Sequence, residues 1–163
     1  MAADYFLKIT GDPYKGESKD KTHKDEIQCL SWSWGENNSG SFGSGTGGGA
    51  GKVNFSDFTF LMQTCKASPN LFLACANGEH IPDATLTCRK AGKEQQEFLV
   101  VKFTDLLISS FQLSGSAGGD DLPNESVSFN FAKIDIAYKP QKPDGTLDSA
   151  IKANYSVETQ SSE

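Results

Sequence analysis

The chain has 163 residues, of which 37% are hydrophobic, and its 15 basic and 21 acidic side chains give a net charge of −6. This size and apolar content suit one domain with a single core, residues 1–163. The acidic balance and the absence of a basic stripe disfavour binding to nucleic acid. The N-terminus, MAADYFLKIT, lacks the features of a cleaved signal peptide, and no apolar stretch approaches the length of a membrane span. We therefore expect a protein made in the cytoplasm without insertion into a membrane.

The N-terminal part of the chain alternates between apolar and polar residues, which indicates strands with one buried face. Residues 5–9 predict a first strand, and the polar, turn-rich segment 11–26 predicts a loop. In residues 26–34 the large apolar residues share one parity and the small residues share the other. We expect the first set to face the core and the second to face away from it; they are Leu30, Trp32 and Trp34, and Cys29, Ser31 and Ser33, respectively.

Residues 41–53, SFGSGTGGGAGKV, are rich in glycine and raise the question of a phosphate-binding loop. A Walker A motif fails at both ends, where Thr46 and Val53 stand, and the G-x-G-x-x-G match leads into a strand rather than a helix. The segment 40–51 is therefore predicted to be a long hairpin loop. Phe42 within it suits a contact that becomes ordered when a partner binds. A mobile tip with a stray aromatic residue is the alternative.

The alternation changes parity at two places along the chain. Val53 and Phe55 differ in parity from the apolar residues after them, which predicts a bulge near residues 56–57. A second change predicts a bulge near residues 132–133. Two bulged, alternating strands favour closure of the sheet into a barrel.

Residues 67–78, ASPNLFLACANG, predict a short helix. Ser68 can cap its start, Pro69 suits the first helical position, and Gly78 suits the left-handed residue after its end. We expect this helix to pack on the side of a β protein.

The remaining segments again predict strands. In residues 84–89 we expect three residues to face inward and three to face outward; they are Ala84, Leu86 and Cys88, and Thr85, Thr87 and Arg89. Residues 97–115 predict two strands or one long bent strand. Tyr155 and Val157 suggest a further short strand, and residues 158–163 a flexible tail.

The sequence offers no constellation that catalysis requires. There is no G-x-S-x-G elbow, and His23 and His80 are not in a metal-ligand spacing. An acid–base pair of Glu79 with His80 is disfavoured against a surface turn. The acidic residues Asp120, Asp121 and Glu125 could bind calcium, although a turn before a strand explains them more simply.

The four cysteines lack C-x-x-C spacing and stand in apolar or alternating contexts. Free buried thiols are favoured over zinc ligands, and a disulfide stays open; the residues are Cys29, Cys65, Cys75 and Cys88. We expect no enzymatic activity, no cofactor and no metal.

Five segments carry a resemblance that covers nearly the whole chain. They are KGESKDKTHKDEI (15–27), LSWSWG (30–35), GKVNFSDFTF (51–60), KASPNLFLACANGEHIPDATLTCRKAG (66–92) and ESVSFNFAKIDIAYKPQKPDGT (125–146). With these motifs in the family's order, the chain resembles the haemolysin-coregulated protein (Hcp) family, the inner-tube component of type VI secretion systems.

The resemblance implies a small β-barrel of two antiparallel sheets with one short α-helix packed on its side. It implies hexameric rings that stack into a tube inside a contractile sheath, meet a spike protein and are expelled into target cells without a signal peptide. It also implies carriage of small effectors in the ring's lumen. Since the chain ends soon after KPDGT, we expect no C-terminal toxin domain. A contractile-phage-like tail-tube protein and a secreted β-sandwich binding module, such as a carbohydrate-binding domain, remain the alternatives.

The resemblance also assigns roles by position. It places Ser31 and Ser33 on the lumen side, where effectors would be contacted. It assigns contact with the adjacent ring to the glycine-rich loop, with the residues Ser41, Phe42, Gly43, Ser44, Thr46 and Lys52. The sequence departs from the family pattern inside that loop and at FLMQTCKAS (60–68).

Overall fold

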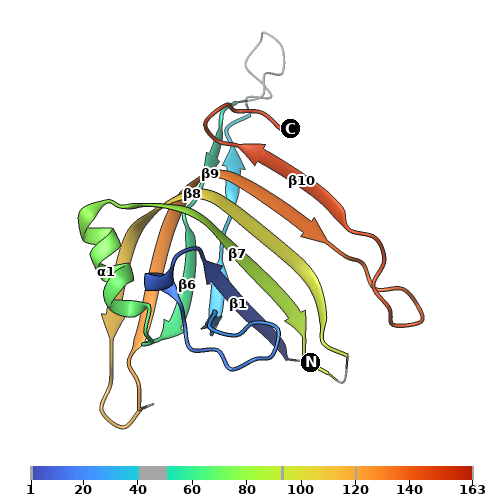
Figure 1. The fold of residues 1–163 in the computed structure, drawn as a ribbon. Coiled ribbons are helices and arrows are strands. Elements are labelled where there is room, and N and C mark those ends of the chain that lie inside the picture. The colour runs from blue at the N-terminus through green and yellow to red at the C-terminus, as the bar shows by residue number, and fades with distance from the viewer. Residues whose placement is uncertain (1, 41–50, 93, 120, 163) are drawn as a thin grey trace.

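The structure, a computed structural model of the chain, describes residues 2–40, 51–92, 94–119 and 121–162. Strands dominate these ranges, and one α-helix lies on their flank (Figure 1). The elements are β1 (Ala3–Ile9), β2 (Ile27–Cys29), β3 (Ser31–Ser33), β4 (Glu36–Asn38), β5 (Val53–Phe55), β6 (Phe58–Gln63), α1 (Ser68–Asn77), β7 (His80–Lys90), β8 (Gln96–Ser114), β9 (Asn124–Tyr138) and β10 (Ile151–Ser156), with a 3₁₀ turn at Asp12–Tyr14.

One antiparallel sheet curls into a nearly closed barrel (Figure 1). Its order is β2–β1–β7–β8–β9–β6–β3, with β10 paired to the far side of β9. The strands at the two ends of this order, β2 and β3, are consecutive in the chain, so the barrel closes where the chain bends at Leu30. The Leu30 amide donates to the carbonyl of Leu61 at 2.8 Å. A second, two-stranded sheet joins β4 to β5, and the predicted fold class is confirmed.

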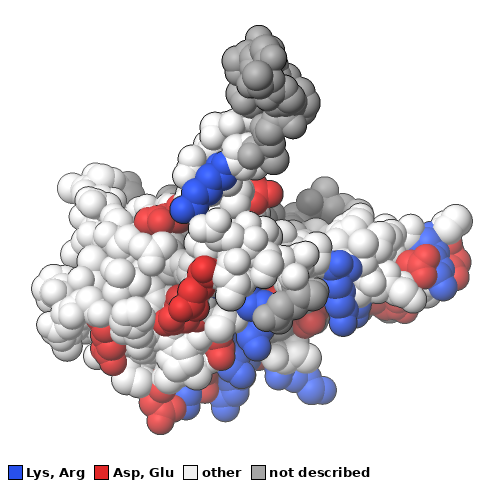
Figure 2. Space-filling model, turned by 90° about the horizontal axis from the view of Figure 1, so that it is seen from above, with Lys and Arg blue, Asp and Glu red and all other residues white. Residues whose placement is uncertain are grey.

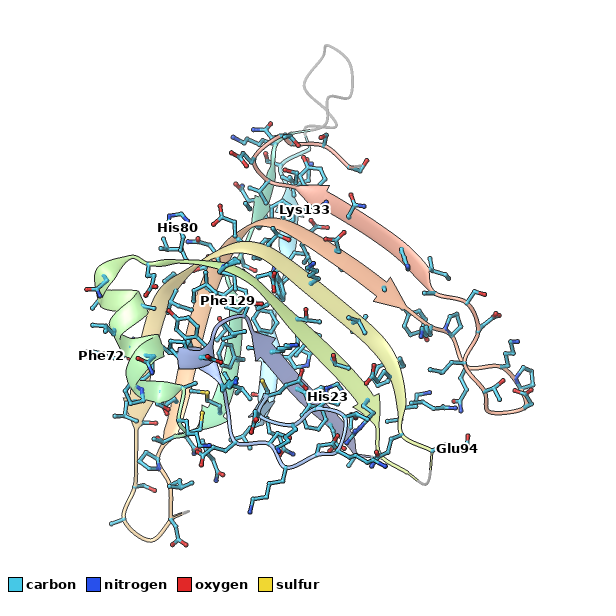
Figure 3. The ribbon with its side chains drawn as sticks, in the orientation of Figure 1. His23, Phe72, His80, Glu94, Phe129 and Lys133 are labelled. Carbon is cyan, nitrogen blue, oxygen red and sulfur yellow. The ribbon has the colours of Figure 1, made fainter. Side chains whose placement is uncertain are left out.

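Aromatic side chains fill the barrel. The rings of Phe58, Phe103 and Phe129 come from β6, β8 and β9 and lie 4.8 to 5.0 Å apart between centroids. All three are fully buried, and Figure 3 shows Phe129 within the barrel. Tilted and edge-on ring pairs at this separation add to the energy of area burial. The core therefore ties together three strands that are far apart in the sequence.

In three neighbouring strands, the side of the strand that faces the core changes at the same level of the sheet. The inward residues change from Phe131 to Ile134 in β9, from Leu106 to Phe103 in β8, and from Ile81 to Ala84 in β7. Asp105 lies at this level and has a positive φ of 57°. The parity change expected near residues 132–133 is thus present, but the strands stay in register there. The register shifts of the sheet lie at Cys88/Arg89 and Ile108/Ser110 instead.

The parity change near residues 56–57 has another cause than the expected bulge. It is a break in the chain direction between β5 and β6, which belong to different sheets. The Ser56 hydroxyl donates to the Gly35 carbonyl at 2.7 Å and accepts from the Gly35 amide at 3.0 Å, which fixes the corner. The long segment 97–115, in contrast, is the single bent strand β8.

Helix α1 packs on β8 with Leu71 and Ala74 buried. Gly78 follows its end with φ 64°, as expected, and a proline lies in its first turn. The cap prediction for Ser68 is wrong, because Ala67 occupies the cap position. The Ser68 hydroxyl accepts from the Cys65 amide at 2.9 Å and lies 2.6 Å from a Glu125 carboxylate oxygen, to which it donates.

The loop 11–26 covers the outer face of β1 and β7, which sequence alternation assigned to solvent. Thr87 and Arg89 face outward, as expected, but they are buried beneath the loop, and the inward set of β7 is confirmed. The Arg89 guanidinium donates to both carboxylate oxygens of Asp20, at 3.0 and 2.7 Å, and lies 4.8 Å from the centre of the Phe6 ring. His23 stacks on the same ring, with centroids 4.5 Å apart. The loop is therefore a packed part of the fold.

The bend at Leu30 also changes two assignments made from the sequence. Leu30 is exposed and Cys29 is buried, the reverse of the prediction, while Trp32 faces inward as expected. Because β2 pairs with β1 and β3 pairs with β6, the two halves of the segment have different buried parities. All four cysteines are free thiols; Cys29 and Cys88 are buried, and Cys65 and Cys75 are partly buried.

Candidate functional site: a hydroxyl-rich face of the barrel

Four adjacent strands, β3, β6, β9 and β8, present two rows of small uncharged side chains on the side away from the core. Strand register aligns Ser33 with Thr59 and Ser31 with Leu61, and continues both rows across β9 and β8. We call this surface the hydroxyl face; its rows are Ser33, Thr59, Ser128 and Ser110, and Ser31, Leu61, Ser126 and Gln112.

Strand alternation fixes this face because the intervening residues are large and apolar. In β3, Trp32 packs toward Phe58 with ring centroids 6.1 Å apart, so Ser31 and Ser33 on either side are exposed on the opposite surface. In β6, Phe58 and Phe60 are fully buried and alternate with Thr59 and Leu61. The core aromatics thus orient the hydroxyls.

The chemistry of the hydroxyl face is that of adaptable hydrogen bonding. The hydroxyls of Thr59 and Ser128 are 2.8 Å apart and hydrogen-bonded to each other. A hydroxyl can donate and accept, and the eight residues of the face include no acid or base. Such a surface can contact many different partners weakly, and it supplies no group able to activate a nucleophile.

The glycine-rich segment connects β4 and β5, which form the small sheet. In this sheet Glu36 pairs with Phe55 and Asn38 with Val53. The ring of Trp34 stacks on the ring of Phe55, with centroids 6.0 Å apart. This contact packs the base of the hairpin against the barrel. Lys52 is exposed at the base. The other predicted loop residues, Ser41, Phe42, Gly43, Ser44 and Thr46, lie outside the described residues.

The side chains weighed as catalytic candidates serve the fold in this structure. His23 is bonded through Nδ1 to Glu26 and through Nε2 to Glu97, at 2.7 Å for the latter. Glu79 is not paired with the adjacent histidine, because it accepts from the Tyr14 hydroxyl at 3.1 Å. His80 instead contacts Asp105 at 2.9 Å.

The metal alternatives gain no support from the described part of the chain. Its residues contain no group of three or more His, Cys, Asp or Glu side chains placed to hold a metal ion. Glu125 of the suggested calcium set is buried against Ser68, and Asp120 lies outside the described residues.

Burial also disfavours thiol chemistry. Burial raises the pKa of Cys88 to about 11 and raises the pKa of Cys29 even further above its ordinary value, with a smaller rise from nearby thiols. Thiols with raised pKa values stay protonated near neutral pH and are poor nucleophiles.

Half of the hydroxyl face could not be found from the sequence. Ser31, Ser33, Ser126 and Ser128 were recognisable as small polar residues opposite a core side, whereas Thr59, Leu61, Ser110 and Gln112 were not singled out. Alternation gives the side on which a residue lies, but the neighbours of a strand are decided by long-range pairing. Thr85, which was expected to face outward, lies on β7, away from this face.

The charge distribution agrees with the composition. Figure 2 shows acidic and basic residues interspersed on the face in view, without a continuous positive stripe among the described residues. In the described ranges, we find no helix with the length and apolar character needed to cross a membrane.

Comparison with known proteins identifies one family. The family model described as "Type VI secretion system effector, Hcp" matches residues 6–138. Protein hcp1 of Pseudomonas aeruginosa is 52% identical over 159 residues, which cover 96% of each chain.

Solved structures agree with this match. A protein titled as a type six secretion system protein superposes with a TM-score of 0.92 at 31% identity, covering 99% of this chain and 100% of that one. Hcp1 from Salmonella typhimurium gives 0.79 at 35% identity with both chains fully covered. A type VI secretion system effector from Yersinia pestis gives 0.76 at 36% identity over 94% of this chain and 100% of that one.

Proposed function

Since the chain belongs to the Hcp family of type VI secretion proteins, we propose that it is a structural subunit of the secretion tube. In this proposal six copies form a ring, rings stack into a hollow tube, and the tube is expelled into a target cell with small effectors held in its lumen. The subunit has no bond to break. Its work is reversible assembly.

The hydroxyl face carries the proposal for the lumen. A channel wall that holds varied small proteins and then releases them needs many weak, neutral contacts, which charged or large apolar walls do not provide. Two rows of serine, threonine and glutamine across four strands, with a single leucine among them, supply such a surface. Ser31 and Ser33 would then face the effectors.

The stacking of rings is assigned to the glycine-rich loop. In this proposal the adjacent ring is contacted by residues between β4 and β5; they are Ser41, Phe42, Gly43, Ser44, Thr46 and Lys52. Ordering each loop residue on contact costs about 1–2 kcal/mol of backbone entropy. Weak stacking that follows from this cost suits a tube that disassembles after firing. The further partners in this proposal are the spike protein and the contractile sheath, and export needs no signal peptide.

The ring proposal is tested by light scattering of the purified chain, followed by negative-stain electron microscopy. We expect hexamers at tens of micromolar and annular particles with a central hole. A strict monomer at this concentration would overturn the proposal.

The lumen proposal is tested with Ser33→Trp, which fills space on the hydroxyl face. We expect rings of unchanged size, and at least a tenfold loss of small effectors from the culture supernatant of cells that still secrete the tube protein. The matched control is Ser149→Trp, at an exposed serine in the 140–150 loop. We expect it to leave ring size and the amount of secreted effector unchanged. Equal loss of rings and effectors in Ser33→Trp would contradict the lumen assignment.

A further inference from the structure

Helix α1 is apolar on both its faces. Leu71 and Ala74 pack against the barrel, yet the outer face also presents an apolar stripe at helical spacing i, i+3, i+4, i+7. We call this the α1 stripe; it comprises Pro69, Phe72, Leu73 and Ala76, all exposed. Phe72 is 57% and Leu73 48% exposed, and Figure 3 shows Phe72 on the outer side of the helix.

The composition of α1 makes this exposure unusual. Its ten residues, SPNLFLACAN, include no charged side chain. A surface helix ordinarily places charged and polar residues opposite its buried stripe, whereas a helix that is hydrophobic all round is normally buried all round. The Phe72 ring lies 6.1 Å from the ring of Phe111 in β8, yet more than half of Phe72 stays exposed, so the described residues cover the α1 stripe only in part.

A second apolar surface continues the core beyond the barrel. Where β8 and β9 extend past β6 and β10 takes its place on β9, register aligns Leu99 with Tyr138 and Ile151, and Val101 with Ile136 and Ala153. Val101 is buried inside the barrel, but exposure rises outward to 47% at Tyr138 and 66% at Ile151. We call this the wing face; it comprises Leu99, Ile136, Tyr138, Ile151 and Ala153.

The opposite side of the same three strands is polar. It carries Lys102, Asp135 and Lys152 among its residues, as expected of a side that meets water. The wing face has no charged residue. The contrast between the two sides indicates that the apolar side is built to be covered.

The two surfaces lie at opposite ends of the molecule. Figure 1 shows α1 at the left end and β10 at the right. In a two-fold dimer the α1 stripe and the wing face would have to lie in one patch and meet reciprocally, whereas two different surfaces at opposite ends suit a head-to-tail contact in which every copy uses both. Such contacts give a closed ring when the rotation between copies closes.

We propose that the α1 stripe of one copy packs on the wing face of the next copy of this chain. A helix laid on the apolar side of a sheet is a standard two-layer arrangement, and burial of both surfaces removes apolar area from water. The proposal rests on the proposed function, because it identifies which surfaces join neighbouring subunits within a ring.

The test uses two variants that each disable one surface, Leu73→Lys and Ile151→Lys. A lysine buried without a partner weakens the contact by about tenfold or more. By analytical ultracentrifugation at tens of micromolar, we expect each variant alone to be a monomer. A 1:1 mixture forms dimers and nothing larger, because the pair has one intact α1 stripe and one intact wing face between them.

Controls keep the result specific. Lys152→Gln changes the polar side of β10 and is expected to form rings. Circular dichroism and thermal melting check that each variant is folded. If either lysine variant is unfolded, the milder Phe72→Ser and Tyr138→Ser replace the pair.

The outcomes separate this inference from the proposed function. A monomeric wild-type chain overturns the ring itself. A wild-type ring with rings also in Leu73→Lys and Ile151→Lys leaves the tube standing and overturns this interface. Monomeric variants whose mixture gives no dimer show that the two surfaces meet other partners, which overturns their pairing.

Discussion

At the scale of single residues, Asp105 is the clearest case of a backbone requirement. It lies in the middle of β8 with φ 57°, at the level where three strands exchange their buried side. A left-handed conformation costs most non-glycine residues about 1–2 kcal/mol, and aspartate and asparagine tolerate it best. Asp105 therefore suits the bend better than an ordinary strand residue would.

We expect Asp105→Val to lower the free energy of unfolding by about 1–2 kcal/mol, and Asp105→Asn or Asp105→Gly to change it by less than about 0.5 kcal/mol. Urea titration at neutral pH measures the difference. Asn130→Val, at an exposed position of β9 without a positive φ, is the control and should be near neutral. Equal loss in the valine and glycine variants would show that the side chain of Asp105 matters more than its φ.

Asp20 holds the loop 11–26 to the outer face of β7 through its charge. Its hydrogen bonds from the Arg89 guanidinium, helped by donors of Thr22, keep the pKa of the Asp20 carboxyl well below its usual range. A carboxyl with a lowered pKa in the folded chain stabilises the fold fully above its unfolded pKa of about 4, and that stability is lost as pH falls toward the folded value.

We therefore expect wild type to resist urea better than Asp20→Asn by a constant margin from pH 8 to pH 5. Below about pH 4 the margin narrows, because the Asp20 carboxyl takes up a proton in the unfolded chain while it stays ionised in the folded one, and this favours unfolding of the wild type. Urea midpoints across this pH range measure it. A margin that persists undiminished at the acid end would show that Asp20 acts through its shape rather than its charge.

At the scale of elements, the loop 11–26 is closed by a contact that only glycine allows. A Cβ on Gly16 would lie 2.5 Å from the carbonyl oxygen of Glu26 and 2.7 Å from the Cα of Ile27. The Gly16 amide also donates to the carbonyl of Asp25 at 2.8 Å. Because backbone rather than a flexible side chain is the neighbour, the loop cannot yield locally.

We expect Gly16→Ala to destabilise the fold by about 1–3 kcal/mol, the usual range for forced overpacking. Thermal unfolding followed by circular dichroism measures it. Gly115→Ala is the matched control, since its nearest neighbour beyond the adjoining residues is Pro123 at 3.9 Å, and it should change stability little. A neutral Gly16→Ala would mean that the two sides of the loop can separate without cost.

The elements show what a sequence can specify by itself. Local patterns sufficed for the inward set of β7, for the end of α1 at Gly78 and for the barrel expected from repeated parity changes. They failed at Leu30, where a single strand-like segment is split into two strands, β2 and β3, which pair with β1 and β6, respectively. They failed again at Arg89, because alternation does not reveal that a polar loop some 65 residues earlier folds over its side.

The same limit applies to the candidate site. Ser31 and Ser33 could be predicted from the sequence, because Trp32 and Trp34 mark the opposite, core-facing parity. Thr59 and Ser110 joined them only once pairing placed β6 and β8 beside β3 and β9. The wing face was hidden for a related reason, since only the register of β8, β9 and β10 brings Leu99, Tyr138 and Ile151 together.

At the scale of the whole molecule, the outer surface of the barrel divides into regions of different character. The loop 11–26 seals one region, the hydroxyl face forms a second, and the α1 stripe with the wing face forms the two ends. Under the proposed function, each of these regions meets a different neighbour in the assembled tube.

The covering of β1 and β7 on both sides has a dynamic consequence. Leu7 and Leu86 face the aromatic interior, while Phe6 and Arg89 lie beneath the loop, so both sides are covered where the middle of β1 pairs with the C-terminal half of β7. Amide hydrogens exchange with deuterium fastest where the backbone opens most readily. We expect mass spectrometry to find the slowest exchange in β1 and β7 and much faster exchange in β10, whose outer edge pairs with no described strand. A pair of strands that opens so rarely would let the molecule carry a mechanical load along its length without local unfolding.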